Sequence, residues 1–91
     1  MRDKQFIKDS IKMDLHRVIN AAGNITKPIP TKSVNEFLNH AYRDFEKIQL
    51  DSKEAELKKE LLQLTKSLKN VDDPLSRLRW VEDIMTLRCR I

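Results

Sequence analysis

The sequence is poor in the residues that mark β-rich, disulfide-bonded or membrane-spanning proteins. Its 91 residues include one glycine, three prolines and one cysteine, and aromatic residues make up only 5%. Scarce glycine and proline argue against an all-β fold, because tight turns depend on both residues. A single cysteine, Cys89, excludes an internal disulfide and a multi-cysteine zinc site. No apolar run approaches the ~20 residues of a transmembrane helix. The first residues do not resemble a signal peptide, so we expect a cytoplasmic protein.

Signatures of catalysis and cofactor binding are equally scarce. Gly23 is the only glycine, so the sequence has no glycine-rich phosphate loop. The two histidines, His16 and His40, have no second histidine or cysteine three or four residues away, and we expect solvated side chains rather than a metal site. The sequence therefore predicts a non-enzymatic protein with no metal, no cofactor and no evident small-molecule substrate.

The residues that are abundant suit a compact helical chain. Hydrophobic residues make up 40% of the sequence and charged residues 35%. The apolar residues recur at steps of three and four, which places them on one side of a helix. We predict an all-α fold with a single domain, residues 1–91, folded as a small antiparallel four-helix bundle. The expected helices cover residues 3–22, 34–49, 53–69 and 74–90.

Local signals mark the boundaries of these helices. A cap residue followed three positions later by glutamate predicts a capping box at two starts, Ser33/Glu36 and Asp51/Glu54. Asp73 before Pro74 predicts the start of the last helix, because aspartate caps a helix and proline suits its first position. Gly23 and Asn24 are expected to end the first helix in the left-handed conformation.

The expected last helix is apolar on more than half of its circumference. One stripe contains Leu75, Leu78, Val81, Met85 and Cys89. The other stripe contains Trp80, Ile84, Leu87 and Ile91. A surface helix needs only one stripe, so the second indicates either burial on two sides or contact with a partner. We expect Cys89 to be a small core residue.

The surplus hydrophobic residues predict a protein that acts by binding another protein, or a second copy of itself as a homodimer. The partner-binding surface would use the stripe that contains Trp80, because large apolar residues outside a core mark contact surfaces and tryptophan is enriched in them. Further candidates on other helices are Phe6, Met13 and Leu62. The alternative is that both stripes are internal.

A second functional hypothesis is a nucleic-acid-binding module. The net charge is +4, and the first 32 residues alone carry seven Lys or Arg against three Asp. The start of the last helix is also basic, and recognition helices often present such residues to nucleic acid. The candidate contacts are Lys4, Lys8, Lys12, Arg77 and Arg79.

Overall fold

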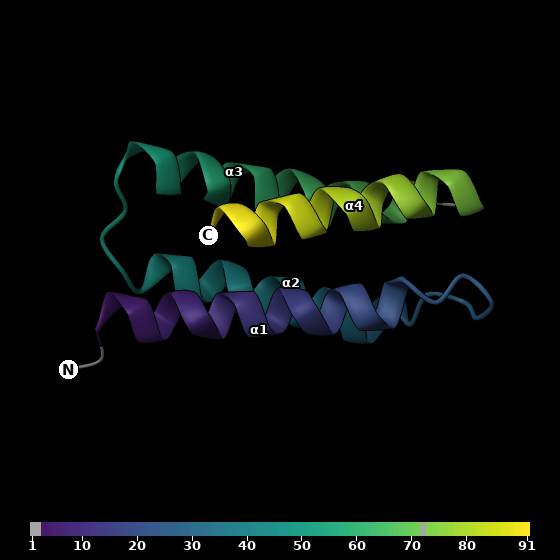
Figure 1. Ribbon diagram of the computed structural model, residues 1–91, viewed down its shortest axis with the longest axis horizontal. Helices are drawn as coiled ribbons and strands as arrows, with labels where there is room; N and C mark the ends of the chain where they lie inside the picture. Colours follow the sequence, from purple (N-terminus) through teal and green to yellow (C-terminus); the bar gives the residue numbers. More distant parts are fainter. Residues whose placement is uncertain (1–2, 72) are drawn as a thin grey trace.

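The computed structural model describes residues 3–71 and 73–91, and it confirms the all-α prediction. The α-helices are α1 (Lys4–Ala22), α2 (Thr31–Glu46), α3 (Ser52–Ser67) and α4 (Pro74–Arg90), and the 3-10 helix η1 (Leu68–Asn70) follows α3. Successive α-helices run in opposite directions along the long axis of an elongated bundle (Figure 1). No helix in the described part of the chain is long and apolar enough to cross a membrane.

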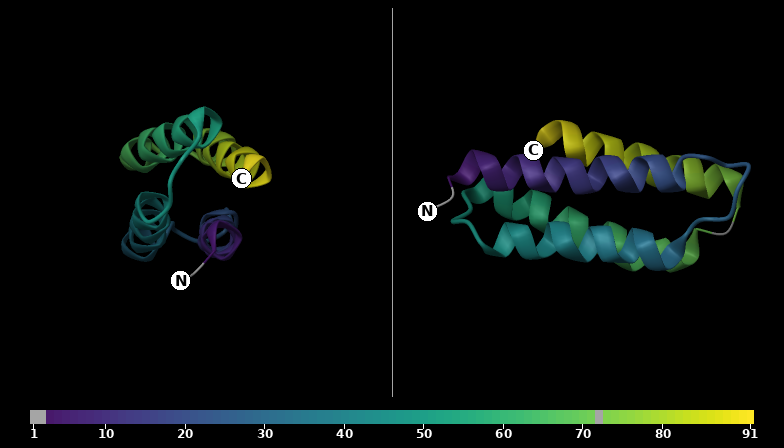
Figure 2. Two further views of the ribbon diagram at one scale, coloured as in Figure 1. Left: turned by 90° about the vertical axis from the view of Figure 1, so that its left-hand side faces the viewer. Right: turned by 90° about the horizontal axis from the view of Figure 1, so that it is seen from below.

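The α-helices form two layers, with α1 beside α2 in one and α3 beside α4 in the other (Figures 1 and 2). Across the layers α1 packs against α4, and α2 packs against α3. The molecule measures 41 × 21 × 19 Å. Helix α4 returns antiparallel to α1, and its C-terminal end lies beside the first half of α1, short of the start of that helix (Figure 1).

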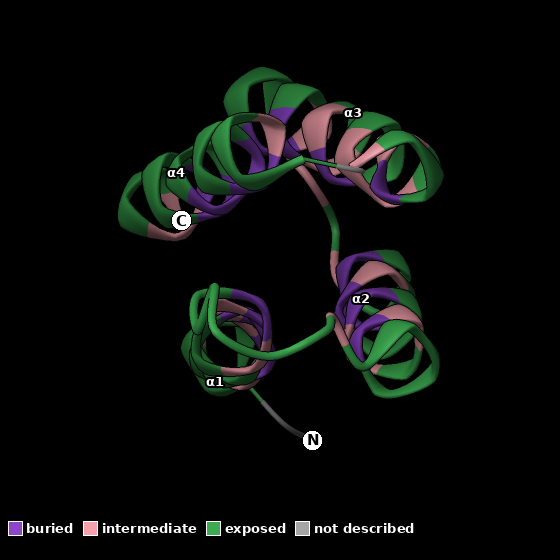
Figure 3. Cartoon of the chain, turned by 90° about the vertical axis from the view of Figure 1, so that its right-hand side faces the viewer, coloured by how far each residue is buried: buried purple, intermediate pink, exposed green. Residues whose placement is uncertain are grey.

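The core lies between the layers, where each helix turns its buried side inward (Figure 3). Burial of a large apolar side chain contributes roughly 1.5–3 kcal/mol, so this shared core is the main source of stability. Its buried hydrophobic members are Ile7, Ile11, Leu15, Val18, Ala22, Val34, Leu38, Ala41, Phe45, Leu57, Leu61, Leu68, Trp80, Val81, Ile84 and Leu87.

Two of the predicted helix starts are confirmed in atomic detail. The Asp51 carboxylate accepts from the Glu54 amide at 2.8 Å, and the Glu54 carboxylate accepts from the Asp51 amide at 3.1 Å, which completes the capping box. The Asp73 carboxylate accepts from the Ser76 amide at 2.7 Å, and Pro74 occupies the first turn of α4. That hydrogen bond lowers the pKa of Asp73, because it favours the ionised carboxyl group.

The predicted start of α2 is wrong. The helix begins at Thr31 and ends at Glu46, which shifts it about one turn toward the N-terminus. Pro30 takes the cap position with φ at −75°, close to the helical value, so the chain enters the helix directly after the proline. Ser33 therefore lies inside the first turn and does not cap the helix.

The predicted left-handed end of α1 is also wrong. Gly23 is right-handed, with φ at −75°, and its amide donates to the Ile19 carbonyl at 2.8 Å. A Cβ atom at this position would lie 2.6 Å from the Ile19 carbonyl oxygen. Glycine is therefore required here because a side chain has no room, and not because of an unusual backbone angle.

Candidate protein-binding surface

Helix α4 presents to solvent most of the stripe opposite to the one predicted, although Val81 of that stripe is buried. Trp80 is only 4% exposed, and Ile84 and Leu87 are fully buried. Ile91 is partly buried and packs against the same core. These residues are internal within a single chain, so the prediction that they form the partner-binding surface is wrong.

Polar groups explain why α4 takes this orientation. The Trp80 indole nitrogen donates to the Leu64 carbonyl of α3 at 2.9 Å, which satisfies its only polar atom inside the bundle. Glu82 lies in the middle of the other stripe, four residues after Leu78 and three before Met85. Turning that stripe inward would bury an ionised carboxylate, which is far more costly than exposing a few apolar side chains.

The exposed stripe of α4 is the candidate binding surface, and we call it the outer stripe. Leu75 is 61% exposed, Leu78 42% and Met85 45%. Together with Glu82 and Cys89, these residues recur at alternating steps of three and four, the spacing of a helix–helix seam. Cys89 is exposed at the end of this stripe, so its predicted place in the core is wrong.

Helices α1 and α4 pack against each other along one side of the bundle (Figure 3). Arg88, one turn after Met85, donates from Nε to the Lys12 carbonyl at 3.2 Å. Beside this contact lies an open hollow of about 310 Å³ between the two helices. Its lining residues are Asp9, Lys12, Met13, His16 and Arg88.

The other predicted contact residues divide between different surfaces. Met13 is 59% exposed and lines the hollow beside Arg88 of α4. Phe6 is 53% exposed and lies seven residues earlier on the same side of α1. Leu62 is 37% exposed on α3, but Lys58, one turn before it, lies over the Tyr42 ring of α2. Leu62 therefore faces the α2 side of the molecule, away from the outer stripe.

The basic residue Arg77, predicted to contact nucleic acid, is instead a buried structural residue. Its guanidinium donates to the carbonyls of Ala22 at 2.6 Å, Lys27 at 2.6 Å and Asn24 at 2.7 Å. These carbonyls belong to the end of α1 and the loop after it. The guanidinium is thus occupied by backbone, and its proposed contact with nucleic acid is wrong.

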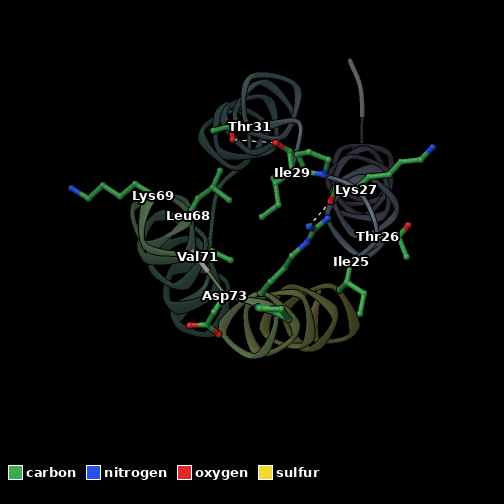
Figure 4. Close-up of a pocket in the computed structure, with 12 residues that line it drawn as sticks. Ile25, Thr26, Lys27, Ile29, Thr31, Leu68, Lys69, Val71 and Asp73 are labelled. Carbon is green, nitrogen blue, oxygen red and sulfur yellow. Dashed lines mark hydrogen bonds between the residues drawn. The ribbon is translucent and has the colours of Figure 1, made fainter.

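The loop that Arg77 holds borders a second open hollow at this end of the bundle (Figure 4). The hollow measures about 640 Å³, and its walls come from the α1–α2 loop, η1 and the start of α4. One dashed line in Figure 4 ends at the Lys27 carbonyl and marks a bond from Arg77. Ile25 is 50% exposed and lies beside α4.

The remaining basic candidates do not gather on one surface. Lys4 and Lys8 bind the carboxylate of Glu54 at 2.5 and 3.1 Å, which ties the first turns of α1 to the start of α3. The hydrogen bond from Lys4 is the largest cause that lowers the pKa of Glu54 to about 2. Lys12 is partly buried, whereas Arg79 is exposed at the start of α4, near the opposite end of the bundle.

Comparisons with protein-family models, with curated proteins and with solved structures find no match for this chain.

Proposed function

We propose that this chain is a non-enzymatic protein that binds an amphipathic helix of another protein along the outer stripe of α4. The observation that carries the proposal is the row of exposed apolar side chains, Leu75, Leu78 and Met85, at the spacing of a helix–helix seam. Binding an amphipathic helix in this way is a common mode of recognition, in which the partner's apolar side covers such a row.

Glu82 favours a different protein over a second copy of this chain. It is exposed at the centre of the outer stripe, with apolar residues on both sides. In a symmetric pairing centred on this stripe, parallel or antiparallel, Glu82 would face Glu82 of the other copy. Like charges that face each other across an interface are unfavourable. A partner helix with lysine or arginine at the matching position would instead place opposite charges together.

The neighbouring side of α1 widens the surface available to a partner. Met13 lines the hollow beside Arg88, which lies one turn after Met85 of the outer stripe. Methionine side chains are flexible and polarisable, so Met13 and Met85 can adapt to the shape of a bound helix. A partner helix that lies along α4 would therefore contact α1 as well.

The proposal is tested with a designed amphipathic helical peptide of about 20 residues, long enough to span the stripe. Its apolar seam is leucine, and its central seam residue is lysine. We expect saturable binding by fluorescence anisotropy at low salt. The double variant Leu78→Ser with Met85→Ser should weaken binding at least tenfold, because two large apolar contacts are lost.

Leu62→Ser is the matched control, since it removes an exposed leucine from a different side of the bundle. Its affinity for the peptide should equal that of the unaltered protein. Light scattering after size exclusion should show a monomer. A dimer that the Leu78→Ser and Met85→Ser changes dissociate would replace the proposal with self-association. Equal loss of binding in the Leu62→Ser protein would show that the peptide merely sticks to exposed apolar residues.

A further inference from the structure

The opposite side of the bundle carries a second group of residues, at the contact between α1 and α2. Asp14 of α1 and Asp44 of α2 are both buried, with relative exposures of 3% and 2%. His40 lies one turn before Asp44 on α2, and its side chain is 54% exposed. One ligand-type atom from each of these residues lies within 4.8 Å of the others.

The two carboxylates have the same arrangement of contacts, in which one oxygen atom faces a basic side chain and the other faces His40. Each Oδ1 faces a basic side chain, with Arg17 at 3.2 Å from Asp14 and Lys47 at 3.0 Å from Asp44. Each Oδ2 faces Nδ1 of His40, in direct contact for Asp14 and at 3.6 Å for Asp44. Three ligand atoms from two helices therefore converge on one point.

A hydrogen atom on Nδ1 of His40 satisfies only part of this arrangement. Nδ1 carries at most one hydrogen, which it can donate fully to only one of the two carboxylates. The Asp44 Oδ2 atom accepts instead from the Ser10 hydroxyl at 2.8 Å. A divalent cation in the place of that proton could accept electron pairs from the imidazole nitrogen and both carboxylate oxygens together.

We propose that Asp14, His40 and Asp44 bind a divalent transition metal ion such as Zn²⁺, which links α1 to α2. One imidazole and two carboxylates are ligands that zinc accepts, and water completes the coordination. Arg17 and Lys47 hold the other carboxylate oxygens in place, the usual role of groups behind the ligands. Ser10 is close enough to orient Asp44.

The exposed ring of His40 supplies both the entry path and the small adjustment that binding requires. The ring contacts Asp14 more closely than two ligands of one ion approach each other, so it turns outward when the metal enters. The Arg17 and Lys47 side chains are 52% and 55% exposed, so solvent screens their charge from the bound ion while they keep their contacts with the carboxylates. An imidazole nitrogen or a carboxylate binds metal only in its deprotonated form, so we expect affinity to fall with acid.

The test is calorimetric titration of chelator-treated protein with Zn²⁺, in a Cys89→Ser background because an exposed thiol binds zinc by itself. We expect one ion per chain. His40→Gln should weaken affinity by at least about tenfold to a hundredfold, because even the loss of a group behind the ligands costs this much. His16→Gln is the matched control, since His16 lies on the α4 side of α1, and it should leave the affinity unchanged.

A second readout separates the site from general surface binding. Co²⁺ should give visible absorption bands in the Cys89→Ser protein, and Asp44→Asn should abolish them while circular dichroism confirms that the helices persist. Absence of saturable zinc binding at millimolar metal would overturn the proposal. So would equal weakening by His16→Gln and His40→Gln, which would leave the three residues as an interhelical hydrogen-bond network only.

Discussion

Arg77 shows how one residue can fix a loop that has no regular structure of its own. Its three donors to backbone carbonyls join α4 to the end of α1 and to residues 24–27. The positive charge lies at the C-terminal end of α1, where the helix dipole is negative and favours a cation. The buried guanidinium and the carbonyls of α1 and the loop satisfy each other's hydrogen bonds, which stabilises both.

Replacing Arg77 with lysine should therefore be strongly destabilising. Lysine cannot reproduce the planar fork of donors, so at least one buried carbonyl loses its partner. We expect a loss of about 2–4 kcal/mol in the free energy of unfolding, measured by urea denaturation with Trp80 fluorescence. The exposed Arg79→Lys change is the control and should stay within about 0.5 kcal/mol. Equal stability of the two variants would contradict this role for Arg77.

The ionisation of Glu54 makes the free energy of unfolding depend on pH. Its pKa is about 2 in the folded protein against an ordinary value of 4.5. A carboxyl group whose folded pKa is lowered stabilises the protein at pH above about 4.5. That contribution is lost as the pH falls from about 4.5 toward 2.

Glu54→Gln isolates the charge, because glutamine can still complete a capping box. We expect the variant to lose about 1–2 kcal/mol at pH 7, a value reduced from the full pKa shift because Lys4 is partly exposed to solvent. Its stability should also change less than that of the unaltered protein between pH 4.5 and 2. Glu60→Gln, at an exposed pair with Arg90, is the comparison. Parallel pH profiles for the protein and Glu54→Gln would rule out the assignment.

At the scale of the element, α4 combines two apolar stripes of opposite roles. The stripe with Trp80, Ile84 and Leu87 completes the core, and the outer stripe with Leu78 and Met85 meets solvent. The helix has a matched pair of leucines that measures this difference, because Leu87 is fully buried and Leu78 is 42% exposed.

Leu87→Ala should cost about 3 kcal/mol in the free energy of unfolding, because it leaves a cavity in the core. Leu78→Ala should change stability by less than about 0.5 kcal/mol. Thermal and urea unfolding of the two variants measure the contrast directly. A larger loss for Leu78→Ala than for Leu87→Ala would mean that α4 is rotated from the orientation described.

The sequence contains most of the information about the elements and less about how they meet. The spacing of apolar residues predicts the four α-helices, and the Asp51/Glu54 capping box is visible as a local pattern. Glu82 in the middle of one α4 stripe was a signal that this stripe faces water. The interface was instead predicted on the stripe that contains the tryptophan.

Contacts between distant segments could not be predicted in the same way. Arg77 donates to the carbonyls of Ala22, Asn24 and Lys27, which lie 55, 53 and 50 residues earlier in the chain. His40 and Asp44 form a visible pair one turn apart, but Asp14 joins them only when α1 packs against α2. Histidine and cysteine spacing in the sequence therefore does not predict a cluster in which two of the three ligands are carboxylates.

At the scale of the whole molecule, the two proposed sites occupy different sides of the bundle. The outer stripe follows α4, whereas the Asp14, His40 and Asp44 cluster lies between α1 and α2. Helix α1 takes part in both sides, with Met13 toward α4 and Asp14 toward α2. The bundle core fixes the positions of both surfaces. A substitution in one surface should therefore leave the structure of the other unchanged.

The central claim is that a basic residue of the partner helix faces Glu82. A charge exchange across the interface tests this claim most directly. Two peptides that differ only in lysine or glutamate at the central seam position are titrated into the unaltered protein and into Glu82→Lys. The unaltered protein should prefer the lysine peptide about two- to fivefold at low salt, and Glu82→Lys should prefer the glutamate peptide. The same preference in both proteins would show that Glu82 does not face the bound helix, and would contradict the proposed mode of binding.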